Sequence, residues 1–299
     1  MEQSFAYYHL PGLFEFFDFY QAFLPLYRDH KEYFYDWARI GSIYGAPADC
    51  IWGGGRVGFG EARPEAVFDL MDQYQISPRL TFSNLFLKKE HLQDSYANAL
   101  CKRAQQSKKA PGVILTSDLL LEYLKENYNG FYFVSSTTKV ITDLDEAKKE
   151  VRRKEFSYVV PDFRFNKPLE IWEDLDRKER DKLEFLCNEC CSFACKDRRA
   201  CYENVSKKAL GETVKDHICK APMGNQGYRF SEAMKNPAFL SRKDIQEVYL
   251  PAGFSNFKIE GRGLGSAILL EFLLYYMVKP KWQLKVREEL YLDAMLDLF

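Results

Sequence analysis

The chain has 299 residues, of which 46% are hydrophobic and 16% aromatic, enough apolar material for a large core in one domain. Its 42 basic and 43 acidic residues nearly cancel, so no overall charge marks a nucleic-acid-binding or membrane-binding protein, and only a local basic groove would serve nucleic acid. The longest apolar run, 267–278, contains Glu271 and is too short to cross a bilayer. We therefore expect no membrane partner.

The first residues, MEQSFAYYHLPGLFEFF, lack the basic region and the small-residue cleavage site of a secretory signal. This absence predicts a cytoplasmic protein. Since the cytoplasm is reducing, the eight cysteines are expected to be free thiols or metal ligands, not a disulfide framework.

Aromatic residues are dense over 13–35, which predicts an amphipathic helix that precedes the main domain. Beyond it, extended and helical patterns alternate. The predicted strands are 40–47, 79–84, 112–118, 131–138, 156–166, the stretch from 183, 238–242 and 256–261. The predicted helices are 64–75, 92–106, 119–127, 143–153, 169–182, 244–250 and one from 264.

Eight strands alternating with helices are typical of a parallel α/β fold, and eight units favour a closed (β/α)8 TIM-like barrel over an open sheet. We expect a single domain over 1–299. Its parts would be an N-terminal helical extension at 1–39, the barrel at 40–280 and a C-terminal helix at 281–299.

A glycine-rich loop follows the first predicted strand and surrounds Arg56. Its glycines are Gly53, Gly54, Gly55, Gly58 and Gly60. Such a loop brings backbone amides close to an anion, and an arginine can clamp a carboxylate or phosphate with two parallel hydrogen bonds. It is neither a Rossmann nor a Walker sequence. A flexible turn with an exposed arginine is an equally good interpretation.

Polar residues stand at the carboxyl ends of most predicted strands, where barrel enzymes carry out their chemistry. With Arg56, the candidate catalytic residues there are Asn84, Asp118, Arg164, Lys258, Glu260 and Arg262. The basic members are candidates to hold carboxylates of a small anionic molecule. Asp118 or Glu260 is a candidate general base in a metal-dependent hydrolase. Neither an HExxH nor a GxSxG motif is present.

The stretch 183–206 is the most informative part of the sequence, because it holds five of the eight cysteines. They are Cys187, Cys190, Cys191, Cys195 and Cys201, and Cys219 follows eighteen residues later. Several thiolates close together repel one another unless a cation or cluster neutralises them. The pattern therefore predicts a metal or iron–sulfur site, and the alternative is a set of buried, unpaired thiols.

The succession of motifs resembles the collagenase-like peptidase family, the thirty-second family of peptidases of unknown type. The motifs are WGGGR, TFSN, VILTSD, FVSSTTK, VVPDFRFN, LEFLCNECC with CKDRRACY, and FKIEGR. The resemblance implies a barrel that in several members holds a four-iron, four-sulfur cluster on four cysteines. Other members look like oxygen-independent hydroxylases that modify RNA or the ubiquinone ring, with prephenate as the oxygen-atom donor.

One subgroup of that family reads N-x-x-C-x3-C-x2-R-x2-H-Y, and this chain has a cysteine where the pattern has histidine. The matching residues are Asn188, Cys191, Cys195, Arg198, Cys201 and Tyr202. The resemblance thus favours Cys191, Cys195, Cys201 and Cys219 as the ligands of a 4Fe-4S cluster, or alternatively of zinc. Cys187, Cys190 and Cys50 are reserve ligands, and Cys101 is expected to pack in the core.

Three functions follow from these patterns. The first is an iron–sulfur oxidoreductase, hydroxylase-like, acting on a small molecule or a nucleobase, with an anionic co-substrate held at the barrel mouth. The second is a metal-dependent, peptidase-like hydrolase. The third is a non-catalytic interaction module with a structural metal or cluster. The expected partner is a small carboxylate-bearing molecule, while nucleic acid and a protein partner remain open.

Overall fold

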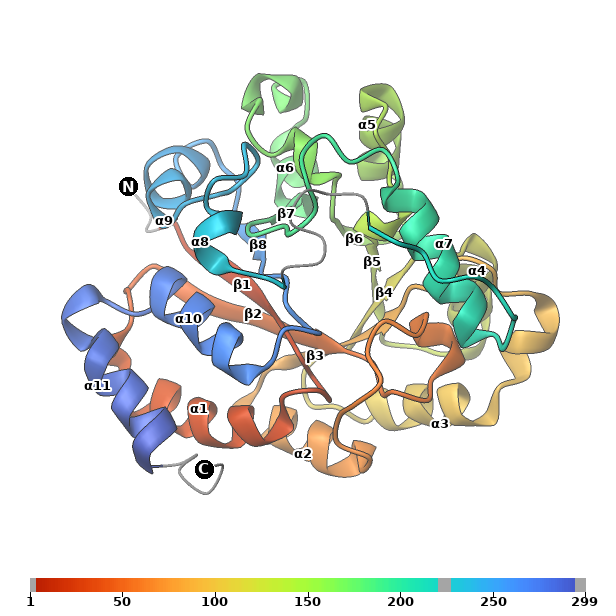
Figure 1. The fold of residues 1–299 in the computed structure, drawn as a ribbon, viewed down its shortest axis with the longest axis horizontal. Coiled ribbons are helices and arrows are strands. Elements are labelled where there is room, and N and C mark those ends of the chain that lie inside the picture. Colours follow the sequence, from red (N-terminus) through yellow and green to blue (C-terminus); the bar gives the residue numbers. More distant parts are fainter. Residues whose placement is uncertain (1–3, 220–226, 294–299) are drawn as a thin grey trace.

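The computed structural model describes residues 4–219 and 227–293, and its centre is a barrel of eight parallel strands (Figure 1). The strands are β1 (Ala6–Pro11), β2 (Ala38–Gly45), β3 (Ser77–Phe82), β4 (Gly112–Leu115), β5 (Tyr132–Ser135), β6 (Phe156–Val159), β7 (Glu184–Leu186) and β8 (Asn256–Lys258). Their order is β6-β5-β4-β3-β2-β1-β8-β7. A parallel bridge between Val159 and Leu183 links the two edges, so the barrel is nearly closed.

Helices surround this barrel, as the alternating sequence pattern predicts. They are α1 (Phe17–Asp29), α2 (Pro64–Tyr74), α3 (Ser95–Ala104), α4 (Asp118–Asn127), α5 (Leu144–Arg152), α6 (Arg177–Lys182), α7 (Arg198–Ala209), α8 (Phe230–Ala233), α9 (Arg242–Asp244), α10 (Ser266–Tyr276) and α11 (Gln283–Arg287). A π turn, Glu288–Asp293, continues α11, and the rest of the expected C-terminal helix lies outside the described residues. In the described part of the chain, no helix is long and apolar enough to span a membrane.

Two of the strand predictions were wrong. Residues 6–11, which we expected to precede the barrel, form β1 between β2 and β8. The aromatic residues of this segment hid its alternation, and Gly12, with φ 96°, separates it from the helix that follows. Residues 238–242 are not a strand. The N–H of Leu240 donates to the carbonyl of Cys187, but no ladder forms beyond this hydrogen bond.

The strands point apolar side chains toward the helices, and their other face carries buried charged side chains together with a small apolar cluster of Tyr44, Ile114, Val134, Val160 and Leu186. Leu80, Val113 and Phe257 belong to the large core between the sheet and the helices, whereas Arg79 and Lys258, on the same strands as two of them, belong to the buried polar set. Period-two alternation gives each strand one face toward the helices and one toward the barrel axis. The barrel axis is therefore lined by a buried layer of charge.

Glu184 is the centre of that layer and has no exposed surface. It forms ion pairs with Arg79 and with Lys258, the latter at 3.2 Å, and its carboxylate lies 3.5 Å from Nε2 of His9. Burial opposes ionisation of Glu184, but the charges of Arg79 and Lys258 hold its pKa well below the usual range. Burial and the charge of Arg79 lower the pKa of His9 to about 3, so this histidine is neutral. The layer is a stabilising network with every member paired.

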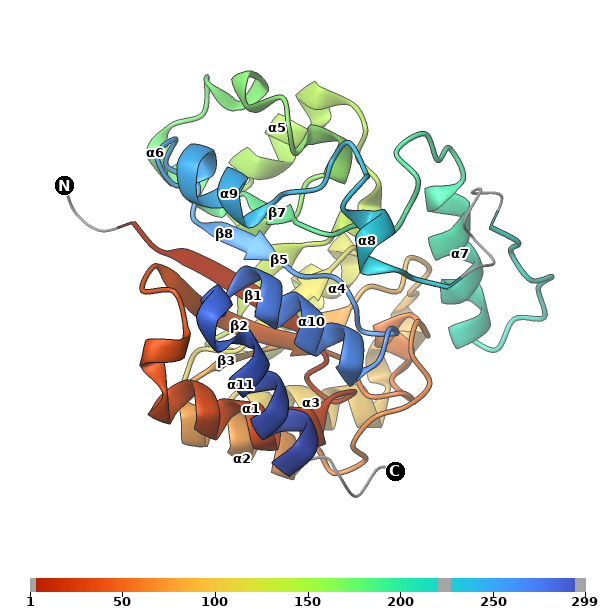
Figure 2. The same cartoon turned by 60° about the vertical axis from the view of Figure 1, so that its left-hand side comes forward.

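The two ends of the barrel differ. Figure 2 shows the strands running from the side of the N-terminus toward the side where α7 projects. Because all strands are parallel, their carboxyl ends meet on the side of α7, and the cysteine-rich loop that follows β7 lies there. The fold thus brings the glycine-rich loop, the cysteines and the residues that follow β8 to one mouth of the barrel.

Candidate functional site

Asn188 joins the ends of β7 and β8, and so places two glutamates next to each other. Its Oδ1 accepts from the N–H of Glu260 at 2.8 Å, and its Nδ2 donates to the carbonyl of Glu260 at 3.2 Å. These two hydrogen bonds join the chain segments two residues beyond the last paired residues of the strands, Leu186 and Lys258. The side chain of Glu189, the next residue, is consequently held beside that of Glu260.

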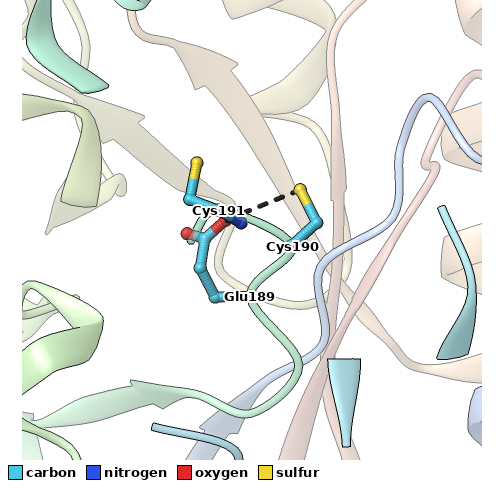
Figure 3. Close-up of side chains that lie close together, drawn as sticks. All are labelled: Glu189, Cys190 and Cys191. Atoms are coloured by element: carbon cyan, nitrogen blue, oxygen red, sulfur yellow. Dashed lines mark hydrogen bonds between the residues drawn. The ribbon is translucent and has the colours of Figure 1, made fainter. Parts of the chain in front are cut away.

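Glu189, Cys190 and Cys191 form a compact group of potential metal ligands on the loop that follows β7 (Figure 3). Their donor atoms all lie within 4.8 Å of one another. The thiol of Cys190 is 3.7 Å from Oε1 of Glu189, and the N–H of Cys191 donates to that same oxygen at 3.0 Å. A carboxylate and two sulfurs at this separation match the donor set of a single ion such as zinc.

Arg198, at the start of α7, is buried and contacts Glu189. It forms ion pairs with Glu189 and, at 3.1 Å, with Asp162, and its Nη1 donates to Oγ1 of Thr137 at 3.2 Å. Its Nε is buried without an acceptor among the described residues. Buried ion pairs of this kind orient their members firmly, so Glu189 is fixed in place.

The pKa values of Glu189 and Glu260 are shifted in opposite directions. Against the effect of burial, Arg198 lowers the pKa of Glu189 to about 2. Burial and the charge of Glu189 raise the pKa of Glu260 well above its usual range, and its protonated carboxyl hydrogen-bonds that of Glu189. Two adjacent carboxyl groups with pKa values shifted in opposite directions can serve as a general acid and a general base. Of the two carboxyl groups, Glu260 therefore holds its proton more strongly.

The thiols of Cys190 and Cys191 also share a hydrogen bond. The bond from Cys190 lowers the pKa of Cys191, and the same bond, with burial, raises that of Cys190. Cys190 additionally contacts Oε1 of Glu260 with its sulfur at 3.3 Å. Cys191 is thus the more readily ionised thiol, as a metal ligand has to be.

Cys201, on the first turns of α7, lies within electrostatic reach of three further cysteines. Burial raises its pKa, Arg56 opposes that effect, and the charges of Cys191, Cys219 and Cys195 raise it further. These four are the cysteines that the resemblance favours as ligands. A positive group bound near them would relieve this repulsion. Among the described residues, the donors that lie within 4.8 Å of one another are those of Glu189, Cys190 and Cys191.

The loop that carries Cys191 and Cys195 is tied down by side chains from elsewhere. Arg164 donates to the carbonyl of Phe193 at 3.1 Å and to that of Cys195, and it also pairs with Asp162 at 2.9 Å. Asn236 donates to the carbonyl of Cys191 at 2.9 Å. Arg164, a predicted site residue, thus positions the cysteine loop and has its donors occupied.

Arg56 is the predicted cation that stays available. It is exposed on the glycine-rich loop, with its guanidinium 3.9 Å above the ring of Tyr202, and it forms no ion pair or hydrogen bond within 4–219 and 227–293. The loop packs closely on α7. A Cβ on Gly55 would come within 2.8 Å of the Cβ of Ala209, and Asn84 donates to the carbonyls of Ile51 and Ser206. Asn84 therefore joins the loop to α7.

The other predicted catalytic residues are engaged away from this group. Lys258 lies in the charge layer inside the barrel with Glu184. Arg262 forms an ion pair with the fully buried Glu15 at 2.5 Å. Asp118 lies on the surface in the first turn of α4 and pairs with Arg153 at 2.9 Å. Arg56, Glu260 and the cysteines therefore lie at the mouth. Lys258, Arg262 and Asp118 are instead held in ion pairs elsewhere.

Of the reserve cysteines, Cys190 belongs to the group at the mouth. Cys187 and Cys50 are buried in the large core, where burial raises the pKa of Cys187 and brings that of Cys50 to about 12. Cys101 packs in the same core. Such thiols stay protonated and behave as small apolar side chains.

Glu189 is a residue of the site that was not predicted from the sequence. In the sequence it reads as a polar residue that ends a strand. The signal that would have found it is its position between two cysteines, nine residues before an arginine on a helix. Only the fold shows that this arginine, Arg198, donates a hydrogen bond to the carboxylate of Glu189.

Comparisons with known proteins bear on the fold. No protein-family model matches the chain, and no curated protein matches its sequence. A solved structure, the U32 peptidase Mk0906, is similar with a TM-score of 0.54 over 87% of this chain and 95% of that one, at 15% identity. This chain therefore has the barrel fold of a U32 peptidase, as its motifs predict.

Proposed function

We propose that the barrel mouth holds a thiolate-bound iron–sulfur cluster, and that the protein is a hydroxylase-like oxidoreductase acting on a small molecule or nucleobase. The observation that carries the proposal is that the group Glu189, Cys190 and Cys191 lies at the mouth next to Glu260, and that α7, which carries Cys201, is tied to this group through Arg198. The eight free cysteines fit a reducing cytoplasm, which we propose as the compartment.

The four cysteines would hold the cluster, which when bound supplies redox and Lewis-acid chemistry. Arg164 and Asn236 donate to the carbonyls of Phe193 and Cys191, and so hold the backbone of the loop that carries Cys191 and Cys195.

The chain's own residues supply binding and proton transfer. Arg56 offers an unpaired guanidinium at the mouth, suited to a carboxylate of an anionic co-substrate. Glu260 holds a proton that it can donate to a bound molecule. Glu189, held by Arg198, keeps that proton on Glu260 through its negative charge.

The first test is anaerobic purification followed by iron, acid-labile sulfide and zinc analysis. We expect near-equal iron and sulfide in the wild type and loss of both in Cys195→Ser. Cys101→Ser, which changes a buried core cysteine, is the matched control and should retain them. Iron and sulfide that survive in Cys195→Ser would contradict this ligand set.

The second test measures binding of prephenate, the donor that the family resemblance implies, to the loaded protein. Arg56→Ala should weaken binding by roughly tenfold to a hundredfold, the usual effect of removing one charge-assisted contact. Arg63→Ala is the control, because Arg63 is exposed and pairs only with Glu61. Retention of the cluster without prephenate binding would favour a non-catalytic module.

A second candidate is a metal-dependent, peptidase-like hydrolase, favoured by the tight grouping of Glu189, Cys190 and Cys191. Donors within 4.8 Å suit one zinc ion, whose tetrahedral sulfur ligands lie roughly 4 Å apart. Zinc without sulfide in the same metal analysis, together with peptide cleavage that a chelator abolishes, would establish this function over the first.

A further inference from the structure

The amino-terminal end of the barrel, opposite the cysteines, contains a cavity of about 1200 Å³. Residues from the starts of β1, β2, β3, β6 and β8 line it, together with α6 and the 250–255 segment. The volume suits a ligand of the size of a nucleotide. Neither the candidate site nor the proposed function makes use of this cavity.

The rim of the cavity is strongly basic. Its charged residues are Lys109, Arg177, Lys178, Arg180, Lys182 and a single acid, Asp181. Within the described ranges, Lys109, Arg177 and Lys178 form no ion pair. These three cations are exposed, so they are free to meet an anion.

Arg180 and Lys182 are held in place without losing their charge. Arg180 donates to the carbonyls of Leu175 and Glu173 at 3.0 and 2.8 Å, and Lys182 donates to those of Val151 and Arg153 at 3.0 and 2.8 Å. Carbonyl groups orient a cation but do not neutralise it. Glu179, Glu155 and Asp176 also act on Lys182. The side chains that line the cavity are nevertheless five basic ones and one acid, Asp181, and two of the basic ones are held by backbone carbonyls.

The floor of the cavity adds to this surplus. His9 lines it and is neutral, with Nδ1 2.8 Å from Oγ of Ser42 and Nε2 3.2 Å from Oδ1 of Asn256. Directly behind it lie Arg79 and Lys258 with Glu184 as their shared counter-ion. Two buried cations facing one carboxylate leave the field at the floor positive as well.

Aromatic side chains occupy one wall. Tyr7 is 40% exposed, which is unusual for a residue on a barrel strand, and its ring centroid is 6.5 Å from that of Phe5. Both residues line the cavity. An exposed ring beside unpaired cations is the combination that stacks on a base while binding phosphates.

We propose that this cavity is a binding site for a phosphate-bearing small molecule, of the class of nucleoside polyphosphates. The phosphate chain would contact the Lys109, Arg177 and Lys178 cations, and the base would lie against Tyr7. Because the cavity is at the other end of the barrel from the cysteines, the site is separate from the proposed chemistry and does not depend on it.

The test measures binding of ATP, inorganic tripolyphosphate and adenosine to the full-length protein by calorimetry at low salt. Arg177→Ala/Lys178→Ala should weaken ATP binding by about tenfold, the product of two exposed charge contacts worth a few-fold each. Lys88→Ala/Lys89→Ala is the control. It removes two adjacent exposed lysines that form no ion pair in the described ranges and that follow β3 at the opposite end.

Each outcome decides the proposal. ATP binding that falls with added salt and with the Arg177/Lys178 variant, but not with the control, supports it. ATP binding tighter than tripolyphosphate, with the difference lost in Tyr7→Ser, identifies a nucleotide, whereas equal affinity identifies the phosphate chain as the ligand. Absence of ATP and tripolyphosphate binding, or equal loss in both double variants, or adenosine binding as tightly as ATP, would overturn it.

Discussion

In the described part of the chain, two glutamate–arginine pairs whose side chains are both almost fully buried have different surroundings. Inside the barrel, Glu184 is surrounded by Arg79, Lys258 and the neutral His9, and the hydrogen-bonding groups of this layer find partners. At the mouth, Glu189 meets Arg198 but also a second carboxyl group, two thiols and an arginine Nε without an acceptor. Buried charge alone does not mark a functional site. Incomplete pairing next to ionisable thiols is what distinguishes the candidate site at the mouth.

The largest effect is expected inside the barrel. Glu184→Gln would leave Arg79 and Lys258 buried without a carboxylate, so the free energy of unfolding should fall by about 3 to 5 kcal/mol in urea. Glu203→Gln is the control, because Glu203 makes only a surface pair with Arg199 and should cost under about 1 kcal/mol. A loss for Glu184→Gln no larger than the control would show that the layer is not a stabilising network.

The next effect is a pH dependence caused by His9. Its pKa is lowered to about 3 in the folded chain, so between that value and the ordinary pKa the unfolded chain binds a proton that the folded chain does not. Stability should therefore fall as the pH falls, by about 2 kcal/mol from about pH 7 to about pH 5. His9→Gln should remove this slope in urea titrations, whereas the exposed His30→Gln should retain it. An unchanged slope in His9→Gln would assign the effect to other groups.

At the mouth, Glu189→Gln should cost less than Glu184→Gln, about 1 to 2 kcal/mol. Arg198 keeps its pair with Asp162 at 3.1 Å, and Glu260 can lose its proton once the neighbouring negative charge is gone. Infrared spectra should show the protonated carboxyl band of the wild type lost in Glu189→Gln at neutral pH. A destabilisation equal to that of Glu184→Gln, with the band intact, would mean that both pairs serve the same structural purpose.

The smallest effect on stability is expected for Arg56→Ala, about 0.5 kcal/mol, because only the contact with the ring of Tyr202 is lost. Arg262→Ala, which leaves the buried Glu15 without its ion pair, should cost about 3 kcal/mol. Thermal unfolding of the two variants measures this contrast. Equal destabilisation would show that Arg56 has a structural role instead of standing ready for a ligand.

The alternation of strands and helices was enough to predict the barrel. The cysteine spacing indicated a metal site after β7, where the structure has the candidate group Glu189, Cys190 and Cys191. The errors at β1 and at 238–242 have a common cause. A strand's place in a sheet depends on partners far away in the sequence, and the aromatic density around Tyr7 and Tyr8 resembled that of the helix beyond.

What the sequence by itself determined is the class of fold, the end of the barrel that carries the cysteines, and Arg56 and Glu260 as residues of the mouth. Only the tertiary structure decided which charged side chains are free. Arg262 and Lys258 look as available as Arg56 in the sequence, but Glu15 and Glu184 reach them from distant segments. The physical reason is that ion pairing and burial are properties of neighbours in space, and the fold alone sets those neighbours.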